Sequence, residues 1–255
     1  MVVLHTSDLH GNWRLPMQFQ DFDVWVDTGD FLPNVSRGER IEANFQKLWL
    51  TKSKLKLRKM VLPWLRERYG SEASYWYVKG SRQPPSSGNI AAELTAWLRG
   101  RPFISVQGNH DFTSLAEPLK RAGAKVWDVA WGPVEVGGEV FAGFREIPYV
   151  TGEWAGELEA GPMGEVAASE LVRKALGEDP TILLTHSPAM GVLDFCKPKG
   201  GNCGIPSLSF ALQTRPHRVK LHMFGHVHEQ PLVVREGGIV FSNAATRARI
   251  IEVPG

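Results

Sequence analysis

The sequence predicts an α/β fold in which buried strands deliver polar side chains to one edge of a sheet. Short apolar runs recur along the chain, and each ends just before a block that contains Asp, Asn or His. Short apolar runs bounded by Gly, Asn or Asp are typical of buried strands. The runs cover residues 2–4, 24–26, 103–106, 181–184 and 219–224. Because open α/β sheets place their sites beyond the carboxyl ends of the strands, we expect the blocks to converge.

The polar blocks carry the side chains of a two-metal site. They are Asp8-Leu9-His10, Gly29-Asp30, Gly108-Asn109-His110-Asp111, His186 and Gly225-His226-Val227-His228. Imidazole suits manganese, iron and zinc, whereas carboxylate and amide oxygens suit harder cations. One carboxylate in the middle of the set can bridge two cations about 3.5–4 Å apart, a pair that activates water and clamps a phosphoryl group. The glycines beside the ligands allow tight turns and close backbone approach.

In this order, the blocks resemble the pattern of the calcineurin-like metallophosphoesterases, which runs D-x-H, G-D, G-N-H-[D/E], H and G-H-x-H. The resemblance extends from Asp8 to His228, apart from a long insertion after Asp30. It implies an α/β (α+β) four-layer sandwich of two mixed β-sheets flanked by helices, with the site at one sheet edge. We therefore expect residues 1–255 to form a single metallophosphoesterase domain that carries a helical, basic insertion over residues 38–100.

The resemblance also divides the ligands between two divalent metal ions. The first ion would be held by Asp8, His10, Asp30 and His228. The second would be held by Asp30, Asn109, His186 and His226, with Asp30 as the bridge. His110 matches the family's non-ligand histidine, which protonates the leaving oxygen or stabilises charge on the transferred phosphoryl group. The ligand set does not choose the metals: manganese is our first expectation, and iron and zinc are compatible.

Residues 185–229 indicate the branch of the family. They contain Thr-His-x-Pro, a loop with Gly-x-Cys-Gly, and Leu-His-x-Phe-Gly-His-x-His-Glu. These segments resemble the small phosphodiesterase-like members related to the metallophosphoesterase-domain-containing proteins of animals, which act, where activity is known, on cyclic nucleotides or model phosphodiesters. Some of those members have Gly at the position of His226, so the site here is the more complete.

We therefore expect a dinuclear-metal-dependent phosphodiesterase whose substrate is a small phosphodiester or nucleotide. Its reaction would be the in-line attack of a metal-bridging hydroxide on phosphorus. Asn109 and His110 would help to hold the non-bridging oxygens, and His110 would be the proton donor. A non-catalytic scaffold is an alternative from another class, and the intact ligand set argues against it.

The segments between the blocks predict the remaining elements in order. A short amphipathic stretch at 12–22 leads to the second strand. In the insertion we expect a long helix at 40–69 ended by Gly70, a linker at 81–88 and a helix at 89–99. The chain after the third strand predicts a helix at 113–122, a hairpin through Gly137-Gly138, helices at 163–176 and from Pro206, and an antiparallel meander at 232–235, 239–242 and 248–253.

Basic residues are concentrated in the insertion. Residues 38–100 contain 12 Lys and Arg against 5 Asp and Glu, which leaves 17 against 22 in the rest of the chain. Such an asymmetry indicates an anionic partner. Two interpretations stay open: a nuclease whose insertion tracks a DNA or RNA backbone, or an amphipathic helical flap with packed aromatic residues and solvated lysines. In the nuclease, the candidates for stacking on bases are Trp49, Trp64, Tyr75, Trp76 and Tyr77.

The composition is that of an ordinary soluble globular protein, and no apolar run approaches the length needed to span a bilayer. We therefore expect no membrane partner. The first strand begins at once and reaches a candidate ligand at Asp8, so we expect no cleavable signal peptide. Cys196 and Cys203 lie in a glycine-rich loop. We expect free thiols and a cytoplasmic protein, and a local disulfide stays open as the alternative.

The other three histidines are expected to be structural or solvated rather than ligands. His5 and His222 lie inside strands, and His217 lies in a turn. Asp111 is expected to cap the helix that follows it, and a supporting contact to the metal ligands is the less favoured alternative. Asp27 has two open interpretations, a supporting contact to the metal ligands or a bond that stabilises its own turn.

Overall fold

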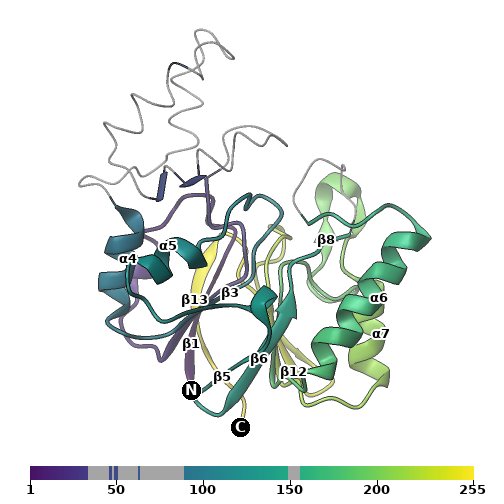
Figure 1. Ribbon diagram of the computed structural model, residues 1–255. Coiled ribbons are helices and arrows are strands. Elements are labelled where there is room, and N and C mark those ends of the chain that lie inside the picture. The colour runs from purple at the N-terminus through teal and green to yellow at the C-terminus, as the bar shows by residue number, and fades with distance from the viewer. Residues whose placement is uncertain (34–45, 48, 51–62, 64–88, 149–155) are drawn as a thin grey trace.

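Two β-sheets pack face to face and helices cover the outer face of each, so the molecule has four layers (Figure 1). This arrangement confirms the predicted α/β sandwich of two mixed sheets. The computed structural model describes residues 1–33, 46, 47, 49, 50, 63, 89–148 and 156–255. The predicted linker at 81–88 and most of the predicted helix at 40–69 lie outside these residues. The five described residues within 40–69 are helical.

The first sheet has the strand order β13-β1-β2-β3-β4. Its parallel strands are β1 (Val2–Ser7), β2 (Val24–Asp27), β3 (Phe103–Ser105) and β4 (Val126–Asp128), and β13 (Arg247–Glu252) runs antiparallel to β1. The register pairs Val26 with His5 on one side and with Ile104 on the other, so β1, β2 and β3 end close together. Three of the predicted apolar runs therefore deliver their polar blocks to one edge.

The second sheet has the order β11-β12-β10-β7-β6-β5. The parallel strands are β6 (Glu139–Phe144), β7 (Ile182–Thr185), β10 (Leu221–Phe224) and β12 (Ile239–Asn243), and the antiparallel edge strands are β5 (Val134–Val136) and β11 (Val233–Glu236). The hairpin through Gly137-Gly138 is confirmed as β5–β6. The predicted C-terminal meander is wrong in part, because β11 and β12 pair but β13 crosses to the first sheet.

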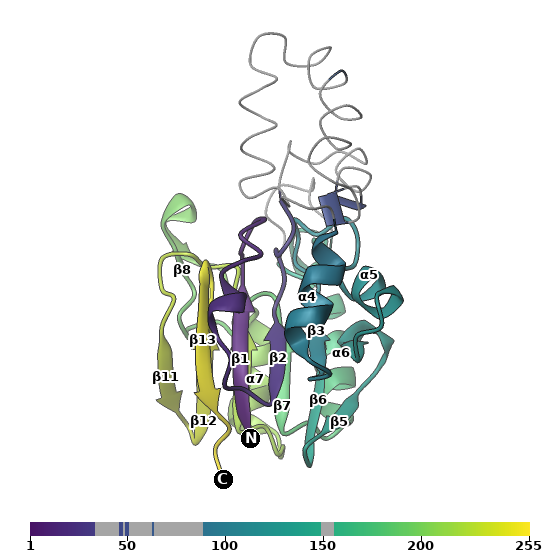
Figure 2. The ribbon, with the colours of Figure 1, turned by 90° about the vertical axis from the view of Figure 1, so that its left-hand side faces the viewer.

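The helices form the two outer layers (Figure 2). On the first sheet lie α4 (Ile90–Leu98) and α5 (Ala116–Arg121), and on the second lie α6 (Pro162–Gly177) and α7 (Pro206–Thr214). The helix predicted at 113–122 is confirmed as α5, which begins three residues later than predicted. The predicted amphipathic stretch at 12–22 contains only the 3-10 turn η1 (Pro16–Gln18). The remaining elements are η3 (Val129–Trp131), η4 (Lys197–Lys199) and a hairpin of β8 (Phe195–Cys196) with β9 (Gly201–Asn202). No described helix is long and apolar enough to cross a bilayer.

Alternation along β2 shows how the layers are filled. Trp25 points outward and packs on Phe103 and Trp97, at ring-centroid distances of 4.4 and 5.3 Å. Val24 and Val26 point to the other face, where they join the cluster between the two sheets. Because successive strand side chains face opposite ways, a strand buried on both faces is apolar throughout. This explains the continuous apolar runs in the sequence.

Buried histidines supply polar links inside this core, as expected for structural residues. The two ring nitrogens of His5 contact Ser242 Oγ on the other sheet at 2.8 Å and Thr28 Oγ1 at 3.0 Å. His222 Nε2 contacts Thr185 Oγ1 at 2.8 Å, so it joins β10 to β7. His217 is only half-buried; its Nε2 lies 2.9 Å from the carbonyl oxygen of Leu212 and stabilises a turn outside the core. The structural role predicted for these three histidines is confirmed.

The buried position of His222 predicts a loss of stability in acid. Burial lowers the pKa of His222 to about 3, whereas a histidine in an unfolded chain titrates near about 6.5. The unfolded chain therefore takes up a proton first, and stability falls as the pH drops below about 6.5, by about 1.4 kcal/mol per pH unit. In denaturant unfolding of the wild type and His222→Gln, the stability difference should stay constant from about pH 8 to about 6.5 and shrink at this rate from there to about pH 5. A difference that is constant over the whole range would contradict the prediction.

Candidate metal centre

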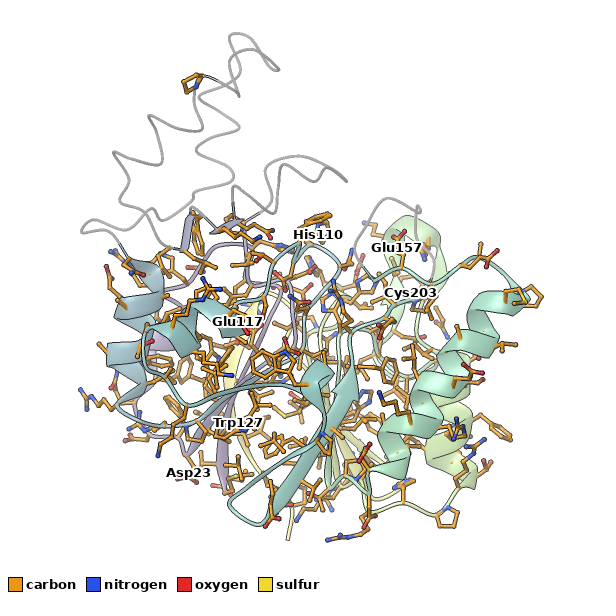
Figure 3. The ribbon with its side chains drawn as sticks, viewed as in Figure 1. Asp23, His110, Glu117, Trp127, Glu157 and Cys203 are labelled. Atoms are coloured by element: carbon orange, nitrogen blue, oxygen red, sulfur yellow. The ribbon has the colours of Figure 1, made fainter. Side chains whose placement is uncertain are left out.

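The polar blocks meet at the end of the sandwich where β1, β2, β3, β7 and β10 terminate. Beyond these strands, the loop after β1 runs beside the loop after β2: the N–H groups of Asp8 and His10 donate to the carbonyl oxygens of Gly29 and Asp30 at 2.8 and 2.9 Å. Figure 3 shows His110 at this end of the molecule and Asp23 at the opposite end. The strand ends therefore act as the platform of the site, as the sequence predicted.

One group of ligands surrounds Asp8. Its Oδ1 lies 3.0 Å from His228 Nε2, and its Oδ2 accepts the N–H of His226 at 2.8 Å and the hydroxyl of Ser7 at 2.6 Å. The His10 and His228 rings lie 5.6 Å apart. One donor atom each from Asp8, His10 and His228 fall within 4.8 Å of one another. This spacing suits a shared cation.

A second group surrounds Asp30. Its Oδ2 lies 3.4 Å from His186 Nε2, which also lies 3.0 Å from Asn109 Oδ1. The other nitrogen of His186, Nδ1, lies 2.7 Å from the carbonyl oxygen of Thr28, which leaves Nε2 facing the site. The His226 ring is 5.1 Å from that of His186. Asp8, Asp30 and His186 again offer donor atoms within 4.8 Å, so the two groups adjoin.

Four of the gathered residues have left-handed backbones: Asp8, His10, Asp30 and His226, with φ of 53°, 44°, 55° and 65°. Residues other than Gly rarely adopt this region, which costs about 1–3 kcal/mol each. Strain of this kind concentrates at functional sites, where surrounding contacts enforce it. The hydrogen bonds between the loops after β1 and β2 supply that enforcement for Asp8, His10 and Asp30, and the bond from its N–H to Asp8 Oδ2 supplies it for His226.

The charges of the site fit divalent cations. Burial raises the pKa values of Asp8 and Asp30, but neighbouring histidines outweigh it and hold both below their usual range. Burial lowers the pKa of His10 to about 4 and that of His226 to about 3, so both imidazoles are neutral at pH 7. Ionised carboxylates and neutral imidazoles are the forms that bind metals.

The remaining two imidazoles pair with the carboxylates. Burial lowers the pKa of His186, but the charge of Asp30 overrides it and raises the value to about 10. The hydrogen bond to Asp8 raises the pKa of His228. Metal binding would displace these protons, which is the expected linkage between cations and histidine ligands. For His110, burial lowers the pKa and the charge of Asp30 opposes it.

Asp111 corrects the preferred sequence prediction and follows the alternative, a supporting contact beside the ligand Asp30. It does not cap the following helix; its carboxylate accepts the N–H groups of Asp30, Leu32 and Gly108 at 2.7, 3.1 and 3.0 Å. The bonds from Asp30 and Leu32 tie the loop after β2 to the loop after β3, and the bond from Gly108 closes the loop after β3 on itself. Burial and then the charge of Asp30 raise the pKa of Asp111 to about 7. Asp27 follows its turn-stabilising interpretation, because its Oδ1 accepts the N–H of Gly29 at 3.1 Å.

Arg145 is a supporting residue that the sequence did not reveal. It follows β6 in the second sheet, yet its guanidinium donates to Gln107 Oε1 at 2.6 Å and to the carbonyl oxygens of Gly108 and Asp111 at 3.3 and 3.4 Å. Arg145 therefore holds the loop after β3 from the opposite sheet. Only the three-dimensional pairing of β6 beside β7 brings it there.

The structure also bears on the predictions for the two cysteines and for the candidate base-stacking residues. Cys196 and Cys203 are free, so the local disulfide is not formed. Trp49, one of the predicted base-stacking residues, is fully buried in a core cluster that also contains residues of α4, so it cannot stack on a nucleic acid. The other four candidate stacking residues lie outside the described part of the chain.

The protein is thus of the class of metal-binding α/β sandwiches. Its candidate ligands, two Asp, one Asn and four His, lie together at one edge of the two packed sheets. Residues 1–230 match the family model of the calcineurin-like phosphoesterases, and the chain belongs to that family. This membership confirms the resemblance of the polar blocks, and the family's metal dependence agrees with the gathered donor set.

Individual relatives cover only part of the chain. Human metallophosphoesterase domain-containing protein 1 is 37% identical over 68 residues, which are 27% of this chain and 21% of the relative. A UPF0046 protein from Caenorhabditis elegans is 38% identical over 72 residues, or 28% and 23% of the two chains. The chain thus spans less than a quarter of the length of these relatives. The crystal structure of phosphopantetheinyl hydrolase from Mycobacterium tuberculosis has a TM-score of 0.49 at 14% identity, covering 95% of this chain and 88% of that chain.

Gly225 provides a test of the packing around Asp8. A Cβ at this position would overlap Ser7 Oγ and Asp8 Oδ2. We expect Gly225→Ala to displace the Asp8 carboxylate and weaken metal binding roughly 10- to 100-fold, as supporting contacts of metal ligands do. Titration calorimetry with Mn²⁺ measures the loss. Gly177→Ala is the control, because nothing lies within 4 Å of its added Cβ. Equal affinities in both variants would show that Asp8 is not held by this contact.

Proposed function

We propose that the protein is a metal-dependent phosphoric ester hydrolase, and more narrowly a phosphodiesterase that acts on a small phosphodiester or nucleotide. The observation that carries the proposal is that the two groups of metal-ligand candidates, around Asp8 and around Asp30, adjoin at one edge of the sheets, with the His110 side chain close to Asp30. The diester preference rests on the resemblance of residues 185–229 to phosphodiesterase-like members of the family. Family membership supports the broader class of reaction.

Within this proposal, the ligands divide as the sequence predicts. Asp8, His10, Asp30 and His228 would hold one divalent cation, and the contacts around Asp8 support this set. Asp30, Asn109, His186 and His226 would hold the other, supported by the contacts of His186 with Asp30 and Asn109. Asp30 lies within reach of both groups and would bridge them. Manganese is the first metal to assay, because carboxylate, amide and imidazole ligands all suit it, and iron and zinc are compatible.

When bound, two divalent cations lower the pKa of a water and neutralise charge on phosphoryl oxygens. The protein's own residues then supply orientation and a proton. His110 Nε2 lies 3.9 Å from Asp30 Oδ2, and its side chain is 21% exposed, so it can reach a leaving oxygen while it stays beside the ligands. Asn109 directs its carbonyl oxygen into the site, and an amide held in this way can donate through its nitrogen to a non-bridging phosphoryl oxygen.

The compartment and the larger substrates belong to the same proposal. Free thiols at Cys196 and Cys203 are in keeping with the reducing cytoplasm that we propose for the protein. The nuclease alternative loses Trp49 as a stacking residue and otherwise depends on residues outside the described part of the chain. Nucleic acid therefore enters the test as one substrate among several.

A metal-by-substrate matrix tests the proposed function. Mn²⁺, Fe²⁺ and Zn²⁺ would each be combined with an aryl phosphomonoester, an aryl phosphodiester, 2′,3′- and 3′,5′-cyclic nucleotides and single-stranded nucleic acid. We expect the highest kcat/KM on a small diester or cyclic nucleotide with Mn²⁺. Asp30→Asn should nearly abolish turnover and weaken both metals together, because a bridging carboxylate serves both. Preference for the monoester, or two tightly bound metals in Asp30→Asn, would contradict the respective parts of the proposal.

The proposed proton donor makes a separate prediction. His110→Ala should leave the metal content nearly unchanged and slow turnover of diesters by about 10²–10⁴, the usual contribution of a general acid. The deficit should shrink for leaving groups such as 4-nitrophenolate, which depart without protonation. Steady-state kinetics over a series of aryl methyl phosphodiesters measures this dependence. Equal deficits along the series would indicate that His110 binds phosphoryl oxygens instead.

A further inference from the structure

A single buried amide, Gln46, holds the backbone on both sides of Asp111. Its Nε2 donates to the carbonyl oxygen of His110 at 2.7 Å, and its Oε1 accepts the N–H of Phe112 at 2.9 Å. Nε2 also lies 3.4 Å from the carbonyl oxygen of Pro33. The side chain is fully buried. Gln46 therefore replaces, for this loop, the pair of backbone hydrogen bonds that a neighbouring strand would provide.

The same loop is tied to the metal site from its other side. The N–H of His110 donates to Asp30 Oδ1 at 2.7 Å, while the carbonyl oxygen of His110 accepts from Gln46. Both backbone polar groups of His110 are thus fixed, one by a predicted metal ligand and the other by Gln46. A shift of the His110 backbone would break the bond to Gln46 or the bond to Asp30, and it would carry the imidazole with it.

The surroundings make this contact stiff. Trp49 and Leu50, which follow Gln46 in the same helical segment, are fully buried and share a core cluster with Phe31 and Leu32. The amide is therefore anchored by packing and cannot easily move with the loop. Hydrogen bonds buried in this way are costly to leave unmade, because water cannot replace the lost partner.

We propose that Gln46 is a positioning residue for His110: it sets the place of the imidazole relative to the metal ligands, and so the rate of proton delivery to the leaving group. The inference rests on the proposed function, in which His110 is the proton donor. It gives the predicted insertion, to which Gln46 belongs, a part in the chemistry and not only in the choice of substrate. Gln46 touches the backbone of His110, and no contact with substrate is implied.

The test uses the full chain loaded with Mn²⁺ and compares Gln46→Leu, Gln46→Glu and the control Gln213→Leu, an exposed glutamine on α7. Gln46→Leu removes both hydrogen bonds to the loop and the contact with Pro33, whereas Gln46→Glu keeps the size and the acceptor but lacks the amide donor to His110 and Pro33. Displacement of a catalytic group by about 1 Å can cost about 10²-fold in rate. We expect both Gln46 variants to lower kcat by roughly 10- to 100-fold on diesters with poor leaving groups. The loss should be far smaller with 4-nitrophenolate, and Mn²⁺ affinity and KM should change less than twofold.

A double-mutant cycle with His110→Ala separates this inference from the proposed function. If Gln46 acts through His110, Gln46→Glu should have little further effect on kcat in the His110→Ala background, because coupled residues are non-additive. A leaving-group dependence in His110→Ala without one in the Gln46 variants overturns the positioning role and leaves the proposed function intact. Uniform losses in His110→Ala overturn the proton-donor role, and the inference falls with it. If Gln46→Leu does not fold, Gln46→Glu decides; a loss of Mn²⁺ affinity with equal kcat deficits for all substrates shows a purely structural role.

Discussion

The carboxylate of Asp30 is the constraint around which the rest of this site is arranged. It is buried almost completely, and its oxygens face His186 on one side and the N–H of His110 on the other. Its own N–H is held by Asp111. A desolvated anion needs compensation by charge and hydrogen bonds, since burial alone would protonate it. His186, which follows a strand of the second sheet, and His10 and His110, which follow strands of the first, supply that compensation. The positions of the strand ends therefore determine the electrostatics of the site.

Many of the strands could be predicted from the local sequence pattern, because these strands are buried on both faces. Continuous apolar runs marked β1, β2, β7 and β10, and the residues just after them became the site. The same reasoning failed where a contact spans distant parts of the chain. Asp111 reaches back to Asp30 across some eighty residues, and a spacing rule for helix caps cannot foresee that bond. The strand β13 was found, but its sheet was not, because pairing with β1 depends on how the chain closes.

The supporting residues Gln46 and Arg145 show the same limit at the site itself. Both act through backbone groups of the loop after β3, so neither needs a motif that would mark it in the sequence. Arg145 approaches from the second sheet and Gln46 from the chain that follows Asp30. Trp49 illustrates a related ambiguity, since an aromatic residue in a basic segment suits nucleic-acid stacking and core packing equally well. Burial decided between them, and burial is a property of the folded chain.

The anchoring of Gln46 has a consequence for any exchange of the segment that follows Asp30 in this protein. Segments that connect two strands are usually the easiest part of an enzyme to exchange, because surface connections tolerate replacement. Here the exchange would also remove Gln46, which hydrogen-bonds to the loop that carries His110. If the positioning role of Gln46 holds, a replacement segment that changes substrate recognition must therefore place a buried amide at the same position, or the enzyme would be slower. One side chain then limits how freely this segment can be exchanged.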